Sequence, residues 1–301
     1  MNEREKGLLF VFATAVISGV SIFLNKYALA SFNPFVFTTL KNSVVAIFVI
    51  SGVLLTARYG ELLRLKLKDW RNLLAIGIIG GSIPFLLFFW GLSQTSAANG
   101  SLLQKSLFIP ASALAFLFLK EKLSRVQLLG AGLLFIGAAL YAGVNFTALA
   151  TGDIAIIAAV LLWSIEDVIS RYVLRNLSPS TVGFGRMFFG SLVMVAFLAA
   201  TSQLPNFAAF TPNHYLWLLA TSLLLLGYNL TFYSGLSRLK VGEATAMLVF
   251  GSVVTTALAA TAGKMPGMIE MAAAGAVICG VVAITFLPKK IPAPKPTKLP
   301  F

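Results

Sequence analysis

Residues 163–186, WSIEDVISRYVLRNLSPSTVGFGR, place charged side chains such as Glu166 and Asp167 in a chain that is almost uniformly apolar. A similar stretch, SGVSIFLNKYALASFNPFVFTTLK, lies 145 positions earlier, at residues 18–41. Arg186 then aligns with Lys41, and each stands seven residues after a proline of the kind that starts helices. The shared spacing predicts that the chain holds two copies of one unit.

The composition indicates a multi-pass membrane protein. Hydrophobic residues make up 58% of the 301 residues, charged residues 11%, and the mean hydropathy is +0.90. A soluble core of this size does not need so much apolar surface. The net charge of +13 is spread over short loops, without a basic patch that has interleaved aromatic residues. We therefore expect the bilayer as a partner and no nucleic acid.

The apolar runs are long enough for ten transmembrane helices, since about 20 residues cross a bilayer. The fold class that we predict is an all-α membrane protein. The expected spans are 7–29, 34–57, 72–92, 97–119, 126–145, 152–174, 179–201, 213–236, 242–262 and 267–287.

Positive charge predicts the orientation of these spans. Of the 23 Lys and Arg residues, Lys41, Lys105 and Arg186 lie within spans. With the N-terminus inside, only Lys26 and Lys264 fall outside, which leaves 18 on the inner side. Cytoplasmic loops carry such an excess. We expect both termini in the cytoplasm and the protein in the plasma membrane.

Five spans in each copy is an odd number, so the two copies must enter the membrane in opposite directions. We expect a first five-helix repeat at 1–147, an inverted second repeat at 148–288, and a disordered, basic, proline-rich tail at 289–301. Inverted repeats are typical of transporters, in which two related halves exchange shapes around a midplane site.

The segment LFLKEKLSRVQLLGAGLLFIGAALYAG, residues 117–143, carries a family resemblance. Its Glu121, a short turn at Leu123-Ser124 and the glycine-rich run from Gly130 resemble the close of a repeat in EamA-type members of the drug/metabolite transporter superfamily. The resemblance covers about residues 7–287 and implies export or exchange of small metabolites, often amino acids, through a central cavity. The second copy departs from the pattern, because Met265 stands where the glutamate would be.

Two equivalent polar stripes are candidates for the cavity walls. In the first helix Thr14, Ser18, Ser21 and Asn25 recur at helical spacing, and the matching positions are Ala159, Trp163, Glu166 and Ser170. Asn25 and Glu166 are poor neighbours for lipid, and Trp163, deep in its span directly before the charged residues, is expected to line the cavity. The alternative is that the serines bond to their own helix or to adjacent helices.

The basic residues within the spans are candidates for binding a carboxylate. From the helical rise, Lys41 and Lys105 lie ~10 and ~12 Å below the outer surface, with no evident acidic partner. They would favour a bound anion or carboxylate, or a neutral lysine; Lys41 could instead extend to the headgroups. Arg186 and Glu166 lie ~10–12 Å from the inner face, where they could pair.

The remaining polar residues leave alternatives open. Asp167 and Arg171 are spaced for an intrahelical ion pair, which leaves Glu166 as the acid for an ammonium group or for proton coupling. Asn229 either shapes the pocket or bonds helix to helix. Pro110 is expected to kink the fourth helix, and its counterpart Val254 predicts that the two copies differ at this bend.

Signatures of catalysis are absent from the sequence: it has no H-E-x-x-H, P-loop or G-x-S-x-G motif. We therefore expect no enzyme activity, catalytic residue, metal or cofactor. The leading hypothesis is a secondary transporter, monomeric or homodimeric, that exports or exchanges a small carboxylate-bearing metabolite, with amino acids as first candidates. The alternatives are an organic-anion or phosphate-ester exchanger, a multidrug efflux protein and, outside transport, a lipid scramblase or membrane enzyme.

Overall fold

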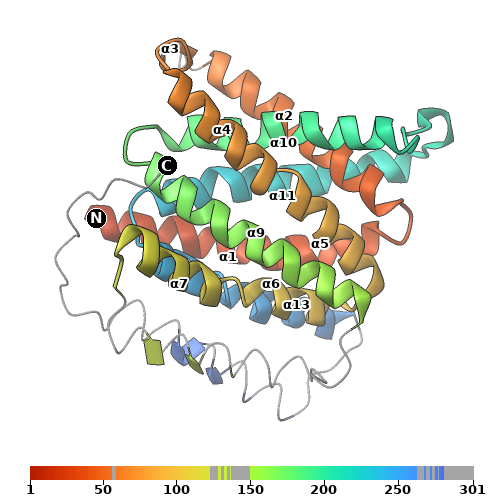
Figure 1. The fold of residues 1–301 in the computed structure, drawn as a ribbon. Helices are drawn as coiled ribbons and strands as arrows, with labels where there is room; N and C mark the ends of the chain where they lie inside the picture. The colour runs from red at the N-terminus through yellow and green to blue at the C-terminus, as the bar shows by residue number, and fades with distance from the viewer. Residues whose placement is uncertain are drawn as a thin grey trace.

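The computed structural model describes residues 1–55, 59–122 and 150–262, with isolated positions between 128 and 136 and between 268 and 280 (Figure 1). The secondary-structure elements of these residues are all helices, and the described residues include no strand. The elements are α1 (Glu3–Ala28), α2 (Pro34–Leu55), α3 (Tyr59–Leu62), α4 (Leu67–Ile79), α5 (Ile83–Gln94), α6 (Ala97–Lys105), α7 (Phe108–Leu119), α9 (Thr151–Val173), α10 (Pro179–Ala200), η1 (Phe207–Ala209), α11 (Pro212–Leu236), α12 (Val241–Met247) and α13 (Phe250–Thr261).

Seven helical segments of the described residues are long and apolar enough to cross a membrane. They are α1, α2, α4 with α5, α6 with α7, α10, α11, and α12 with α13. The 23-residue α9 is equally long, but each 18-residue window of it contains three charged residues. The fifth and tenth expected spans, 126–145 and 267–287, lie almost entirely outside the described residues, and so does the tail 289–301.

The distribution of side chains is that of a protein surrounded by lipid. Large apolar side chains such as Leu55 and Leu216 are exposed, whereas Lys41, Glu166 and Arg186 are buried. In water this arrangement would be unfavourable on both counts. In a bilayer the apolar surface faces the acyl chains and the charged groups are enclosed by helices. The chain is a multi-pass membrane protein.

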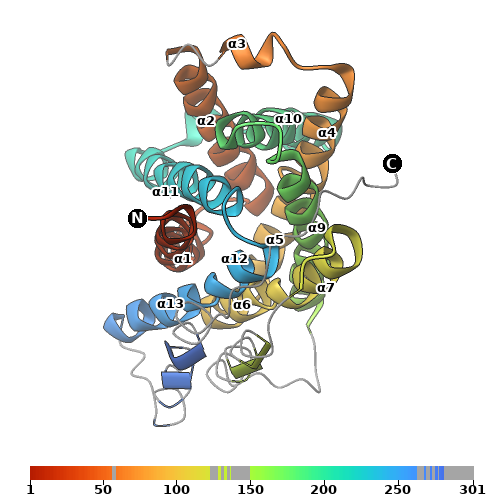
Figure 2. The same cartoon turned by 90° about the vertical axis from the view of Figure 1, so that its left-hand side faces the viewer.

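The helices pack mainly across the two halves of the chain (Figure 2). α1 packs against α11 and α13, while α9, its counterpart in the second half, packs against α5 and α7. α2 and α10 pack against each other. Exchanging each span with its counterpart reproduces these contacts, so the packing has the pattern of two related halves.

Three of the spans are broken near their middle. α4 gives way to α5 at residues 80–82, α6 to α7 at 106–107, and α12 to α13 at 248–249. The expected difference between the copies at Pro110 is therefore wrong, because the second copy breaks at the equivalent level without a proline. There, Val249 N donates to Ala246 O at 3.1 Å and Gly251 N to Leu248 O at 2.9 Å, a tightened turn that needs no proline.

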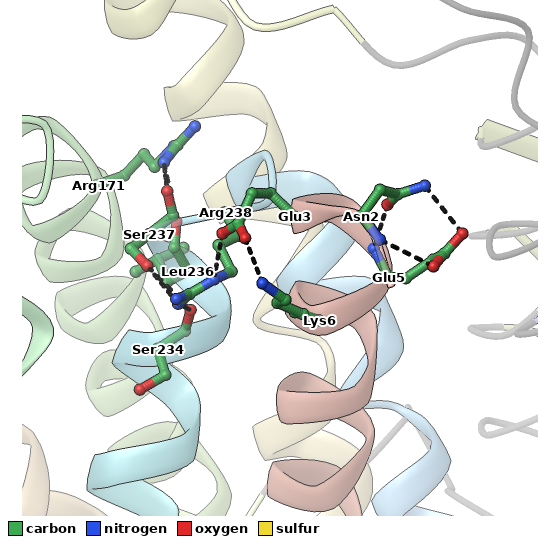
Figure 3. A network of polar contacts seen from close by, with 9 residues as sticks. All are labelled: Asn2, Glu3, Glu5, Lys6, Arg171, Ser234, Leu236, Ser237 and Arg238. Atoms are coloured by element: carbon green, nitrogen blue, oxygen red, sulfur yellow. Dashed lines mark hydrogen bonds and ion pairs between the residues drawn. The ribbon is translucent and has the colours of Figure 1, made fainter.

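Polar contacts gather at the two ends of the bundle. At the end that holds the N-terminus, Glu3 accepts from Lys6 and Arg238 at 2.8 and 2.9 Å, and Arg171 donates to the carbonyls of Leu236 and Ser237 (Figure 3). At the other end, Lys26 Nζ donates to Leu92 O at 2.9 Å. Successive spans therefore run back and forth between two faces.

Candidate functional site

One pocket brings residues from both halves of the chain together at the level of the broken spans. Its volume is about 60 Å³, counted as the space open to the centre of a water molecule. Its charged lining residues are Lys41, Lys105, Asp167 and Arg186, and its aromatic ones are Phe85, Phe88, Phe89, Trp163 and Tyr228.

Lys41 of α2 points into this pocket and does not extend to the membrane surface. It is 1% exposed, and its Nζ lies 3.9 Å from the centre of the Phe89 ring and 5.3 Å from that of Phe37. Its polar contact is with Asn25 Oδ1, at 3.4 Å. Aromatic rings stabilise a desolvated ammonium only in part, and within the described residues Lys41 has no ion-pair partner.

Lys105 is the last residue of α6, directly before the break in that span. Its Nζ donates to Ser18 Oγ at 2.6 Å and to Gln104 Oε1 at 2.9 Å, and the residue is 4% exposed. In the described part of the chain no carboxylate forms an ion pair with it. Lys41 and Lys105 thus present two buried cations to one pocket.

Arg186 and Glu166, whose pairing the sequence left open, form a buried ion pair. Nη1 of Arg186 lies 3.7 Å from Oε2 of Glu166. Oε1 of Glu166 accepts from Tyr233 Oη at 2.7 Å and from the Ser170 hydroxyl. Glu166 is not among the lining residues. It lies behind Arg186 and fixes it, rather than facing the pocket itself.

The break between α4 and α5 supplies a carbonyl to this cluster. Gly80 O accepts from Trp163 Nε1 at 2.9 Å and from Arg186 Nε at 3.3 Å. A side chain at Gly80 would meet the carboxyl of Glu166, and one at Gly81 would meet the backbone of Arg186. The two glycines let the broken span approach α9 and α10 closely, and the freed carbonyl orients two side chains of the pocket wall.

The expected ion pair between Asp167 and Arg171 is wrong. Nε of Arg171 pairs with Oε1 of Glu121 at 3.3 Å, and its Nη1 donates to two carbonyls at the end of α11. Asp167 lies one turn before Arg171 on α9 and lines the pocket. Residues four apart in a helix can meet, but the guanidinium of Arg171 turns away to Glu121 and to the end of α11.

The other predicted residues divide between the pocket and its surroundings. Ser21, Asn25 and Trp163 line it, as do Lys41, Lys105 and Arg186. Asn229 does not: its Nδ2 lies 3.5 Å from Gly183 O, a bond between α11 and α10. Gln104, Tyr228 and the phenylalanines of α5 also line the pocket and were not predicted. The spacing of Phe85, Phe88 and Phe89 on one helical face is a sequence signal for the phenylalanines, and Gln104 and Tyr228 have none.

Metal binding has no support from geometry in the described ranges, where no three His, Cys, Asp or Glu residues are grouped to hold an ion.

Helices that enclose a charged pocket between two related halves, with several spans broken at its level, define a membrane transport protein. The chain belongs to the EamA-like transporter family, whose sequence pattern matches residues 5–143 and 150–286. The match supports a transporter rather than an enzyme, and it supports the drug/metabolite transporter resemblance.

Similar proteins in other organisms carry the same description. An uncharacterized transporter of Methanothermobacter thermautotrophicus is 26% identical over 67% of this chain and 65% of its own length. The uncharacterized transporter YyaM of Bacillus subtilis is 24% identical over 63% of each chain. The match spans somewhat less than two thirds of these relatives. A crystal structure with 19% sequence identity has a TM-score of 0.76 and covers 94% of this chain and 98% of its own, which shows the shared fold.

Proposed function

We propose that this protein is a secondary transporter that exports or exchanges a small carboxylate-bearing metabolite by alternating access, with amino acids as the leading substrates. The observation that carries the proposal is the pair of buried ammonium groups, on Lys41 and Lys105, in one pocket without ion-pair partners among the described residues. A buried charge without a counter-ion costs several kcal/mol. A substrate carboxylate would supply the counter-ion.

The form of the pocket supports a small substrate with both polar and apolar parts. Ser21, Asn25 and Gln104 offer hydrogen bonds beside the lysines. Phe85, Phe88 and Trp163 form an aromatic wall, with ring centres 5.4 Å apart from Phe85 to Trp163 and from Phe88 to Trp163. A carboxylate with a short apolar or polar side chain fits this combination better than a large drug.

The charge balance separates this proposal from the alternatives. Three cations in the lining disfavour a cationic drug, and Asp167 opposes the dianionic headgroup of a phosphate ester. A lipid scramblase needs a polar groove that faces lipid, whereas these residues are buried between helices of both halves.

The test is the thermal stability of the purified protein against amino acids, carboxylic acids, sugar phosphates and organic cations. Ligands that bind the folded state raise its melting temperature by mass action. We expect carboxylates to stabilise the protein, and Lys41→Gln or Lys105→Gln to weaken that binding at least tenfold. Lys68→Gln, at an exposed position of α4, is the matched control. Stabilisation by cations alone would instead support multidrug efflux and contradict a carboxylate site.

We also propose an orientation of the protein in the membrane. The excess of Lys and Arg in the loops supports cytoplasmic termini and residence in the plasma membrane. We further propose that transport is coupled to protons through an acidic residue of α9.

A further inference from the structure

Two adjacent carboxylates of α9 have different surroundings. Oε1 of Glu166 accepts from Tyr233 and Ser170, and its Oε2, which has no hydrogen bond among the described residues, lies 3.7 Å from Arg186 Nη1 in an ion pair. Asp167 lines the pocket, is 2% exposed, and its Oδ2 is buried without a hydrogen-bond partner among the described residues. A buried carboxylate oxygen without a donor is unfavourable. Asp167 is therefore a group that is completed by something that enters the pocket.

The groups that face Asp167 come from several helices. α2 and α6 contribute Lys41 and Lys105, and α10 contributes Arg186. α11 contributes Tyr228, and α9 itself Glu166, to which Tyr233 donates. α5 and α7 have no ionisable side chain, and the charged residues of α4 lie in its first turns. On α12, Glu243 is paired with Arg4 at 3.2 Å.

Arg186 does not give Asp167 a counter-ion of its own. It interacts electrostatically with both carboxylates, but Glu166 lies within ion-pair distance of it. The two lysines do not form ion pairs with Asp167 either, in the part of the chain that the structure describes. None of the three cations that line the pocket forms an ion pair with Asp167 in the described residues. Its Oδ2 can therefore accept a hydrogen bond from a ligand.

We infer that Asp167 is a binding site shared by the ammonium group of an amino-acid substrate and by a proton, which compete for it. This inference rests on the proposed function and narrows it, because it assigns the second end of a zwitterion. The carboxylate of the substrate lies toward Lys41 and Lys105, and its ammonium group toward Asp167. Competition between substrate and proton at one carboxylate makes transport an exchange of one for the other.

The exchange balances in protons and charge. Without substrate, the Asp167 carboxyl carries a proton and is neutral. When the zwitterion binds, the O–H bond of the carboxyl breaks and the proton leaves to solvent on the open side. The ammonium group of the substrate then donates to the carboxylate. One proton is released for each amino acid bound, and one is taken up when the substrate leaves.

The sign of the pH dependence follows from this competition. In the range where the proton occupies the free site, amino-acid affinity rises tenfold for each unit of increasing pH, since one proton is displaced. A carboxylic acid without an amino group displaces no proton and lacks this rise. Loss of charge on the lysines at high pH weakens the binding of both kinds of ligand equally. The difference in pH dependence between amino acids and deaminated acids therefore measures the displacement of the proton from Asp167.

The experiment compares ligands that differ only in the amino group. L-Leucine, L-serine and L-glutamate are titrated beside 4-methylpentanoate, 3-hydroxypropionate and glutarate, with purified full-length protein in weakly buffered solution. Binding and proton release are measured together. Asp167→Asn keeps the shape of the side chain but cannot hold a titratable proton. Asp153→Asn is the control on the same helix, because Asp153 lies outside the pocket and accepts from Asn99 Nδ2 at 2.7 Å.

The expected result is release of about one proton per amino acid bound, in line with linkage, and none with the deaminated acids. Asp167→Asn should abolish the release and weaken amino-acid binding at least tenfold, while Asp153→Asn should keep both. Binding of amino acids without proton release would overturn the inference and leave the carboxylate site intact. Binding of the deaminated acids alone would do the same. If none of the six ligands binds, the proposed function fails together with the inference.

Discussion

A charged side chain inside a membrane protein is stabilised only by what surrounds its last few atoms. Lys41, with rings on its ammonium and one long contact to Asn25, is incompletely compensated. Glu166 is better compensated, by two hydrogen bonds to Oε1 and an ion pair of Oε2 with Arg186, although Oε2 has no hydrogen bond among the described residues. The first is suited to exchange partners with a ligand, and the second to hold its neighbours in place. Burial alone does not separate the two roles.

Tyr233→Phe tests the supporting role of Glu166. The change removes the hydroxyl that donates to Glu166 at 2.7 Å and leaves a buried carboxylate with fewer donors. We expect a lower melting temperature, from a loss of about 1–2 kcal/mol in stability, and a several-fold weaker carboxylate affinity through a less fixed Arg186. Tyr215→Phe, at an exposed tyrosine of the same helix, should change neither. An unchanged melting temperature for Tyr233→Phe would contradict the supporting role.

The basic residues of the pocket were predictable from the sequence, and its acidic residue was not. The repeat and the depth of the basic residues led to Lys41, Lys105 and Arg186, all of which line the pocket. The same alignment chose Glu166 over Asp167, although the wall contains Trp163 and Asp167, four residues apart. Adjacent residues differ by 100° around a helix. A polar stripe with few members does not fix the phase of the helix that closely.

Among the elements, the break between α4 and α5 has the largest influence on the site. In a continuous helix the residue that would donate to Gly80 O is Pro84, which has no backbone N–H. The break leaves this carbonyl to Trp163 and Arg186 instead. The apolar pattern of residues 72–92 predicted one uninterrupted span, because Gly80, Gly81 and Pro84 interrupt neither the length of the run nor its apolar character. Pro84 removes a hydrogen bond of the continuous helix, and the glycines let the break lie close to α9 and α10.

Gly80→Ala should therefore disturb the site from the element that supports it. The added methyl group would meet the side chain of Glu166, which is fixed by three partners and buried. Overpacking of this kind costs about 1–3 kcal/mol, seen as a lower melting temperature and weaker carboxylate binding. Gly52→Ala in α2, where an added methyl group meets nothing within 4 Å, is the control and should be neutral. Equal behaviour of the two variants would refute the close approach.

For the whole molecule, composition and the repeat predicted a helical membrane protein whose halves are related. Most helix bounds agree to within a few residues with the expected spans, because runs of about 20 apolar residues bounded by charge have few alternative structures. The contacts that bring four charged residues into one pocket were not predictable in the same way. Lys41 and Arg186 were placed at different depths, and their long side chains bridge that difference.

The orientation of the molecule is testable with single cysteines. In a Cys279→Ser background, Arg64→Cys lies in the turn before α4 and Ala208→Cys lies between α10 and α11, at opposite ends of the bundle and both exposed. With cytoplasmic termini, a membrane-impermeant thiol reagent should label Ala208→Cys in intact cells and Arg64→Cys only after permeabilisation. The opposite labelling pattern would reverse the assigned orientation.

Glu121 is a buried carboxylate that joins three helices at one end of the bundle. Its Oε2 accepts from Val241 N at 2.8 Å while its Oε1 pairs with Arg171, so it joins the ends of α7, α9 and α12. Glu121→Gln should cost about 1–3 kcal/mol in stability, because buried partners lose their acceptor. Glu5→Gln, at an exposed carboxylate of the capping box, is the control. A melting temperature equal to that of the control would show that the junction is not stabilising.

Only the first copy of the repeat has this glutamate in its sequence, since Met265 occupies the matching position of the second copy. Under the proposed alternating access, the junction at Glu121 contributes free energy only in the shape that keeps α7, α9 and α12 together at that end. The resting populations of the two shapes are then unequal, by a factor of ten for each ~1.4 kcal/mol of difference. In the proposed transport cycle, a two-fold repeat with this glutamate in one copy is a biased switch, and Glu121 contributes to the bias.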